Sequence, residues 1–111
     1  MTDMDVYLAY SEQYRLIDDN LDDLVRRAES FLQATLIIDG WKQANKNYID
    51  ARNKVFDANQ ELIKTLFAEF TASTKSIQEA LNELKKTPDL IGKVASLISS
   101  AVKKGTELKA A

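Results

Sequence analysis

The chain has 111 residues, of which 45% are hydrophobic and 29% are charged, with three glycines and one proline. This composition is typical of a helical bundle and differs from that of a disordered chain. The absence of cysteine excludes a disulfide framework, a thiolate nucleophile and a zinc–thiolate site. The absence of histidine excludes the Glu-x-x-His motif of di-iron bundles. We therefore expect neither a metal nor a cofactor.

The net charge of −2 is unevenly distributed along the chain. Residues 1–40 hold nine acids and three bases (net −6), whereas residues 41–87 and 88–111 each have a net charge of +2. We expect the acidic segment to pair with the rest of the chain. The chain has no concentrated basic face, so we do not expect it to bind nucleic acid. The acidic N-terminus and the lack of an apolar run of about 18 residues predict no signal peptide and no membrane span. The expected location is the cytoplasm.

Residues 3–38 are predicted to form one long helix, with Thr2 or Asp3 as its cap. Its apolar and aromatic residues follow a three-four alternation for about four and a half heptads. The members of this stripe are Tyr7, Tyr10, Tyr14, Ile17, Leu21, Leu24, Ala28, Phe31, Thr35 and Ile38. Tyrosines on such a stripe are usually core residues.

Four carboxylates lie close together on this first predicted helix: Asp18, Asp19, Asp22 and Asp23. They could suggest a metal site, but carboxylates on one helix lack the convergent ligands that bundles take from several helices. Asp22 with Arg26 and Asp23 with Arg27 have the spacing of helical ion pairs. We interpret the cluster as a solvated face.

A second helix is predicted over residues 42–86, because a stripe of apolar and small residues continues from Ala44 to Leu84. Between the two helices, Gly40 can act as a glycine cap, which would pair Trp41 with Leu36. A turn there would fold the chain into a long antiparallel hairpin that places Phe31 opposite Ala51. Two alternatives remain open: one continuous helix through Gly40 with a partner chain along it, and a domain-swapped dimer with the same pairings.

A third helix is predicted over residues 88–104. Thr87-Pro88-Asp89 combines a capping residue, a proline at the first helical position and an acid behind it. Lys103, Lys104 and Gly105 mark its expected end, with residues 105–111 as a frayed tail. The expected fold is therefore an all-α three-helix bundle, in which residues 1–111 form one domain.

The third helix, about 24 Å long, cannot cover the whole of a hairpin of roughly 50 Å. This geometry predicts that apolar residues near the closed end of the hairpin lack a partner within the chain. The predicted patch consists of Val25, Leu32, Leu36, Ile37, Trp41, Ile49 and Phe56. A contiguous exposed set with Trp and Phe usually marks an interaction surface.

These features favour a non-enzymatic protein-binding module, of the immunity-protein, chaperone or adaptor type, whose partner is a second copy or another protein. A hairpin of about one hundred residues with Gly40-Trp41 at its turn resembles, in layout, the helical-hairpin substrates of ESX-type secretion. Their turn carries Trp-x-Gly, which this chain lacks, and the third helix is not part of that pattern. A small apolar ligand between the helices is a further alternative. The sequence contains neither a phosphate-binding loop nor a nucleophile motif, so we do not expect an enzyme.

Overall fold

The computed structural model describes all 111 residues and contains four packed α-helices and no strand. They are α1 (Asp3–Arg27), α2 (Phe31–Ala51), α3 (Glu61–Leu84) and α4 (Ile91–Ala110), with the short 3-10 helix η1 (Pro88–Leu90) before α4. The all-helical class is confirmed. The helix count is four rather than three, because the stretch that was predicted to form two long helices forms three shorter ones, α1, α2 and α3.

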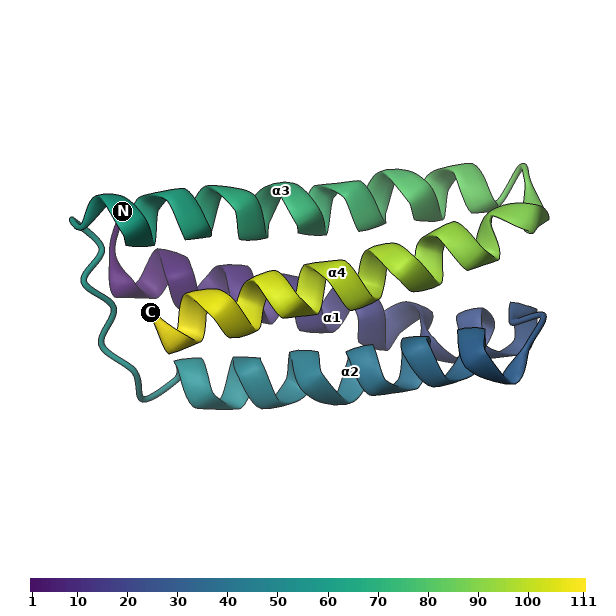
Figure 1. The fold of residues 1–111 in the computed structure, drawn as a ribbon, viewed down its shortest axis with the longest axis horizontal. Coiled ribbons are helices and arrows are strands. Elements are labelled where there is room, and N and C mark those ends of the chain that lie inside the picture. The colour runs from purple at the N-terminus through teal and green to yellow at the C-terminus, as the bar shows by residue number, and fades with distance from the viewer.

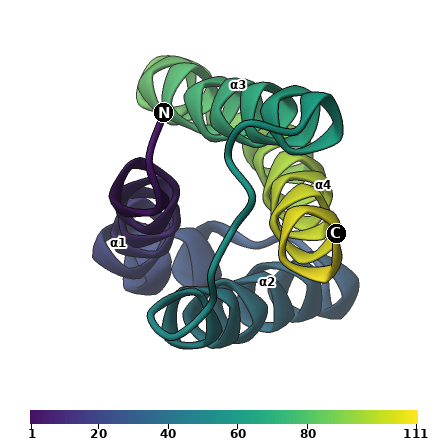
Figure 2. The ribbon, with the colours of Figure 1, turned by 90° about the vertical axis from the view of Figure 1, so that its left-hand side faces the viewer.

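The four helices lie at the corners of a square when the bundle is viewed along its axis, in the order α1, α2, α4, α3 (Figure 2). Three of the four sides are closely packed, whereas α1 and α3 approach each other at few points. The molecule measures 42 × 21 × 19 Å. Both chain ends lie at the same end of the bundle as the segment that joins α2 to α3 (Figure 1).

The first turn lies at residues 28–30, not at Gly40. Helix α1 ends at Arg27, and Ser30 begins α2 as its N-cap, with its Oγ accepting a hydrogen bond from the Gln33 N–H at 3.1 Å. This turn satisfies backbone donors that would otherwise be unpaired at the start of α2. Gly40 is buried in the middle of α2, so the predicted hairpin at 39–41 is wrong, as is the ESX-like layout that depended on it.

The second helix boundary that the sequence analysis missed is the crossover segment, residues 52–60, which runs diagonally between α2 and α3 (Figure 2). The predicted stripe placed Val55 on a helix, but Val55 is 83% exposed. Its neighbour Phe56 turns inward, stacks near Tyr10 with ring centroids 6.2 Å apart, and donates its N–H to Asp3 Oδ1 at 3.2 Å.

Helix α3 runs unbroken through the hydroxyl-rich stretch at residues 71–76, as the apolar stripe favoured. The hydroxyls of Thr71, Ser73, Thr74 and Ser76 each donate to a backbone carbonyl three or four residues earlier. Such bonds let these residues sit inside a helix without an unpaired donor.

Pro88 begins η1, which leads directly into α4 at Ile91, three residues after the predicted start, and the Thr87 side chain makes no capping hydrogen bond. The predicted end at Gly105 is wrong, because α4 continues to Ala110 and buries Leu108 completely. A Cβ at Gly105 would lie 2.9 Å from Phe70 Cε1 and 3.2 Å from Tyr10 Cε1. The glycine therefore allows close packing instead of ending the helix.

The core consists of two hydrophobic clusters separated by buried polar side chains. The larger cluster draws on all four helices, and the smaller one, with Phe56 and Leu108, lies beside the crossover segment. Between them, the Tyr10 hydroxyl donates to Gly105 O at 2.6 Å and Gln13 Nε2 donates to Thr74 Oγ1 at 3.0 Å. No buried side-chain polar atom lacks a partner, as native packing requires.

The expected attraction between the acidic N-terminal segment and the rest of the chain produces no ion pair. All three ion pairs between elements involve α4. One joins it to α2 (Lys109–Asp50, 2.9 Å), and two join it to α3 (Lys104–Glu69, 3.3 Å, and Lys93–Glu83, 3.9 Å). All the acids of α1 are exposed, including Asp23, which pairs with Arg27 on the same helix.

Candidate functional site

The seven residues of the predicted patch do not form one surface. Ile37 and Phe56 are 0% and 4% exposed, so their place in an uncovered patch is wrong. The reason is that the turn lies at 28–30, so that α4 begins beside the start of α2 and covers Ile37, whereas the crossover segment carries Phe56 into the smaller cluster. Leu36 is half-buried against the larger cluster, whereas Leu32 and Ile49 are 67% and 48% exposed.

Val25 and Trp41 do come together, in an open groove between α1 and α2 with a volume of about 690 Å³. We call it the α1/α2 groove. Its lining is Leu21, Asp22, Val25, Arg26, Ile38 and Trp41. The apolar floor therefore comes from both helices, with one acid and one base from α1.

Three tyrosines continue from this groove toward the crossover end of the same helix pair. The Tyr48 ring of α2 lies between two α1 tyrosines, with centroids 5.4 Å from Tyr7 and 5.7 Å from Tyr14. All three are half-buried, as is Trp41, which donates its Nε1–H to Asp18 Oδ1 at 2.9 Å. We call Tyr7, Tyr14, Trp41 and Tyr48 the aromatic strip.

The hydroxyls of the aromatic strip have different electrostatic surroundings. Partial burial, together with the negative charge of Asp18, raises the pKa of Tyr14 above its usual value. Hydrogen bonds from Tyr7 and Ser11 lower the pKa of Tyr48, and Arg15 acts in the same direction. The Tyr7 hydroxyl donates to the Tyr48 oxygen at 3.1 Å. These contacts hold the half-buried rings in one arrangement.

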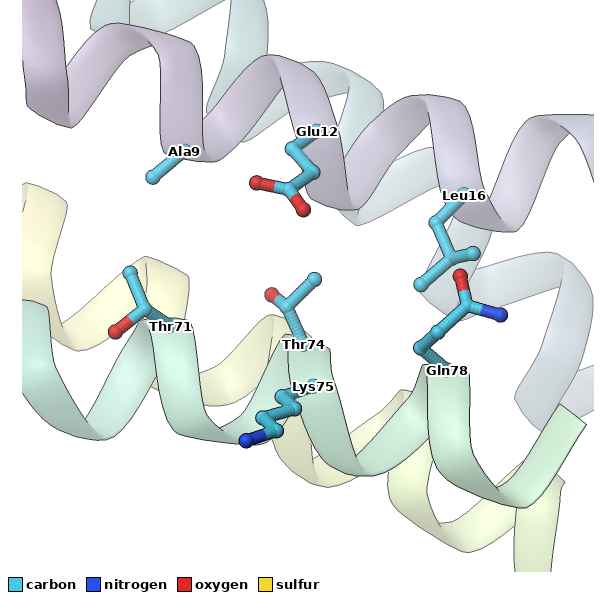
Figure 3. Close-up of a pocket in the computed structure, with 7 residues that line it drawn as sticks. All are labelled: Ala9, Glu12, Leu16, Thr71, Thr74, Lys75 and Gln78. Carbon is cyan, nitrogen blue, oxygen red and sulfur yellow. The ribbon is translucent and has the colours of Figure 1, made fainter. Parts of the chain in front are cut away.

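A second hollow, of about 340 Å³, lies along the loosely packed side between α1 and α3 (Figure 3). The α1 side contributes Ala9, Glu12 and Leu16, and the α3 side contributes Thr71, Thr74, Lys75 and Gln78. Only two of the seven lining residues are apolar, so this hollow does not resemble the apolar ligand pocket that was one alternative. Its Thr74 hydroxyl already bonds Gln13.

Neither a cluster of metal-binding side chains nor a membrane-crossing helix is present in the structure. No three acidic side chains converge on a point where they could hold a metal ion, and the aspartates at 18–23 follow the surface of α1. None of the helices combines the length and the apolar character that crossing a membrane requires.

Of the aromatic strip, Trp41 was placed in the predicted patch, whereas the tyrosines of α1 were interpreted as core residues, although the spacing of the strip was visible in the sequence. Tyr7 and Tyr14 are seven residues apart, and so are Trp41 and Tyr48, which places each pair on one face of a helix. The predicted hairpin turned these pairs toward other residues. Only the turn at 28–30 brings the two faces opposite each other.

No protein-family model matches this chain, and neither a curated protein nor a solved structure shows significant similarity to it.

Proposed function

We propose that this protein is a non-enzymatic protein-binding module and that the α1/α2 groove with the aromatic strip is its contact surface. The observation that carries the proposal is the apolar groove at Val25 and Trp41, which opens to solvent between α1 and α2 and continues into three stacked tyrosines. Tryptophan and tyrosine are the residue types most enriched where binding energy concentrates in protein interfaces.

The groove has the features of a partner surface. Its lining combines four apolar side chains with the charged groups of Asp22 and Arg26, and protein interfaces likewise combine an apolar centre with a polar rim. The tyrosine and tryptophan rings are held by stacking and hydrogen bonds, so a partner would not have to immobilise them. Pre-organised rings reduce the entropy cost of binding.

The lining of the groove also supports binding over catalysis. It contains one carboxylate and one guanidinium but no serine, threonine, lysine or tyrosine. Nucleophilic catalysis needs an activated side chain of one of those types, or a carboxylate placed against a reacting group with a second residue to assist it. A long surface with aromatic side chains suits a protein better than a small substrate.

Site-specific photo-crosslinking tests the proposal. A photoreactive residue at Lys42, four residues after Ile38 on the same α2 face, should form adducts in cells that make this protein, whereas the same residue at Glu79 on α3 should not. Val25→Glu should remove the adducts from position 42, because it places a charge on the apolar floor of the groove. Leu62→Glu, at a residue 59% exposed on α3, should leave them unchanged.

Adducts that form equally at Lys42 and Glu79, or that persist with Val25→Glu, would contradict the proposal. Circular dichroism of each variant shows whether the bundle is intact, since a folded Val25→Glu variant without adducts isolates the loss of the contact surface. The mass of each adduct identifies the bound protein, whether it is a copy of this chain or another protein.

A further inference from the structure

We infer that the partner of the α1/α2 groove is a second copy of this chain, related by a two-fold axis that places Asp22 of each copy against Arg26 of the other. This inference rests on the proposed function of the groove and commits it to one occupant. It is carried by two charged side chains at the groove that remain without an ion pair although their spacing permits one.

Two acid–base pairs with identical spacing follow each other on α1. Asp23 and Arg27 form an ion pair, with Arg27 Nε 2.8 Å from Asp23 Oδ2. Asp22 and Arg26, one position earlier, have the same residue types and the same four-residue separation, yet their charged groups form no ion pair. Arg26 Nε instead donates to the backbone carbonyl of Asp22 at 3.3 Å.

The two pairs also differ in location. Asp22 and Arg26 line the α1/α2 groove, whereas Asp23 and Arg27 do not. The carboxylate of Asp22 and much of the hydrogen-bonding capacity of the Arg26 guanidinium are therefore available to another molecule, and both lie beside the apolar floor. A guanidinium can bind a carboxylate through two parallel hydrogen bonds, which gives such a contact a defined geometry.

A surface with one acid and one base four residues apart on a helix is complementary to itself in the antiparallel direction. A two-fold axis that passes midway between Asp22 and Arg26 brings each acid opposite the base of the other copy, so the contact forms twice. The same axis passes beside Val25, which brings the apolar floors of the two grooves together. Trp41 would then be covered from outside the chain.

The position of this axis also answers the main objection, which is that α1 is acidic, with seven acids and three bases between Asp3 and Arg27. Because the axis lies near the C-terminal end of α1, the N-terminal parts of the two helices extend in opposite directions. Asp18 falls opposite the 28–30 turn of the second copy instead of opposite its counterpart. Asp3, Asp5 and Glu12 of each α1 are therefore separated from the acids of the other α1, and Glu29 of the turn is the acid that lies nearest to Asp18 and Asp19 across the axis.

Charge reversal tests this pairing. Asp22→Arg and Arg26→Asp should each weaken self-association by at least about tenfold, because each creates two like-charge contacts across the axis. An equimolar mixture of these two variants should associate one to one, since both contacts across a mixed pair are then of opposite charge. Sedimentation velocity measures the association, and the emission of Trp41, the only tryptophan, should shift to longer wavelength when dilution separates the copies.

Asp23→Arg and Arg27→Asp are matched controls, because they make the same charge changes one position along the helix. Each breaks the ion pair within α1 and should leave self-association unchanged. A wild type that stays monomeric at its highest attainable concentration would overturn the inference. So would a mixture of Asp22→Arg and Arg26→Asp that fails to associate, or controls that weaken association as much as the groove variants do.

Failure of this inference can be told apart from failure of the proposed function. Groove-dependent crosslinks to a different protein, together with a monomeric wild type, would keep the groove as a binding surface and replace the second copy as its occupant. The absence of any groove-dependent crosslink would contradict both.

Discussion

Gly40 of α2 lies directly against Ile98 of α4. A Cβ at Gly40 would lie 2.4 Å from Ile98 Cγ2, which is closer than two carbon atoms can approach. Isoleucine has one strongly preferred χ1 rotamer in a helix, so its methyl group cannot easily swing away. No glycine in the chain has a positive φ, so Gly40 serves the close approach of two helices instead of a turn.

We predict that Gly40→Ala destabilises the protein by about 1–3 kcal/mol through overpacking, even though alanine favours helix by about 1 kcal/mol over glycine. Most of this cost should disappear when Ile98→Ala removes the methyl group. A double-mutant cycle by urea unfolding measures the coupling. Gly92→Ala is the matched control, because there a Cβ meets the end of the flexible Gln33 side chain at 3.1 Å. Additive effects of Gly40→Ala and Ile98→Ala would contradict this account.

Asp50 of α2 accepts hydrogen bonds from Lys109 at 2.9 Å and Lys46 at 3.0 Å. The bond from Lys109, followed by that from Lys46, lowers the pKa of Asp50. Because the folded pKa lies below the unfolded value of about 3.9, the ionised carboxylate stabilises the fold above that pH, and this contribution is lost as pH falls through the folded pKa.

We predict that Asp50→Asn lowers the melting temperature near neutral pH and that the difference from wild type shrinks when pH falls below about 4. Thermal unfolding across that range measures the effect. Glu79→Gln, at an exposed acid of α3 with no ion pair, serves as the control. A difference between wild type and Asp50→Asn that is constant over the whole range would show that the charge is not responsible.

The turn between α1 and α2 is the element that determines which faces of the molecule meet. Ser30→Ala removes the hydrogen bond from the Gln33 N–H to Ser30 Oγ and should cost about 1 kcal/mol, the usual effect of losing an N-cap. Ser96→Ala, at an exposed position inside α4, should cause little change. Chemical unfolding compares the two variants. Equal effects would mean that Ser30 does not stabilise the start of α2.

The fold class and the start of the last helical segment at Pro88 could be predicted from the sequence, because composition and a Thr-Pro-Asp signal act locally. The break at 28–30 could not be found from periodicity, since the apolar stripe continues in phase through Ala28. The available signal was Ser30-x-x-Gln33, a capping pattern. Gly40 was misleading, because the sequence does not contain the contact with Ile98 that explains it.

The misplaced helix boundaries also determined how much of the candidate site could be predicted. Val25 and Trp41 were placed together in a surface patch, and the structure does bring them together in one groove. Phe56 was assigned to that patch because the crossover segment was predicted to be helix, and Ile37 because the predicted turn at Gly40 placed it beyond the reach of the last helix. A stripe that spans Ala51, Val55 and Leu62 in regular steps does not reveal that the chain leaves the helix between them.

At the scale of the molecule, the C-terminal turn of α4 completes the smaller cluster. Leu108 is fully buried there with Val6, Tyr10 and Phe56. Deleting residues 106–111 should therefore destabilise the protein by about 2–5 kcal/mol, the range for losing a buried leucine side chain, and lower the melting temperature by several degrees. Deleting only residues 110–111 should have little effect. Equal melting temperatures for the two truncations would show that this end of the chain does not contribute to the core and is frayed, as the sequence predicted.

The crossover segment, residues 52–60, is the only covalent link between two antiparallel helix pairs of nearly equal length. Each pair is closed by a short turn, so many of its contacts join residues near in sequence, which favours fast formation of each half. The two halves then adhere through the packed side of α2 against α4. A protease cut at an exposed residue of the crossover segment would thus leave two fragments held together by the core alone. The nicked protein would unfold at a temperature that depends on its concentration, as a heterodimer does.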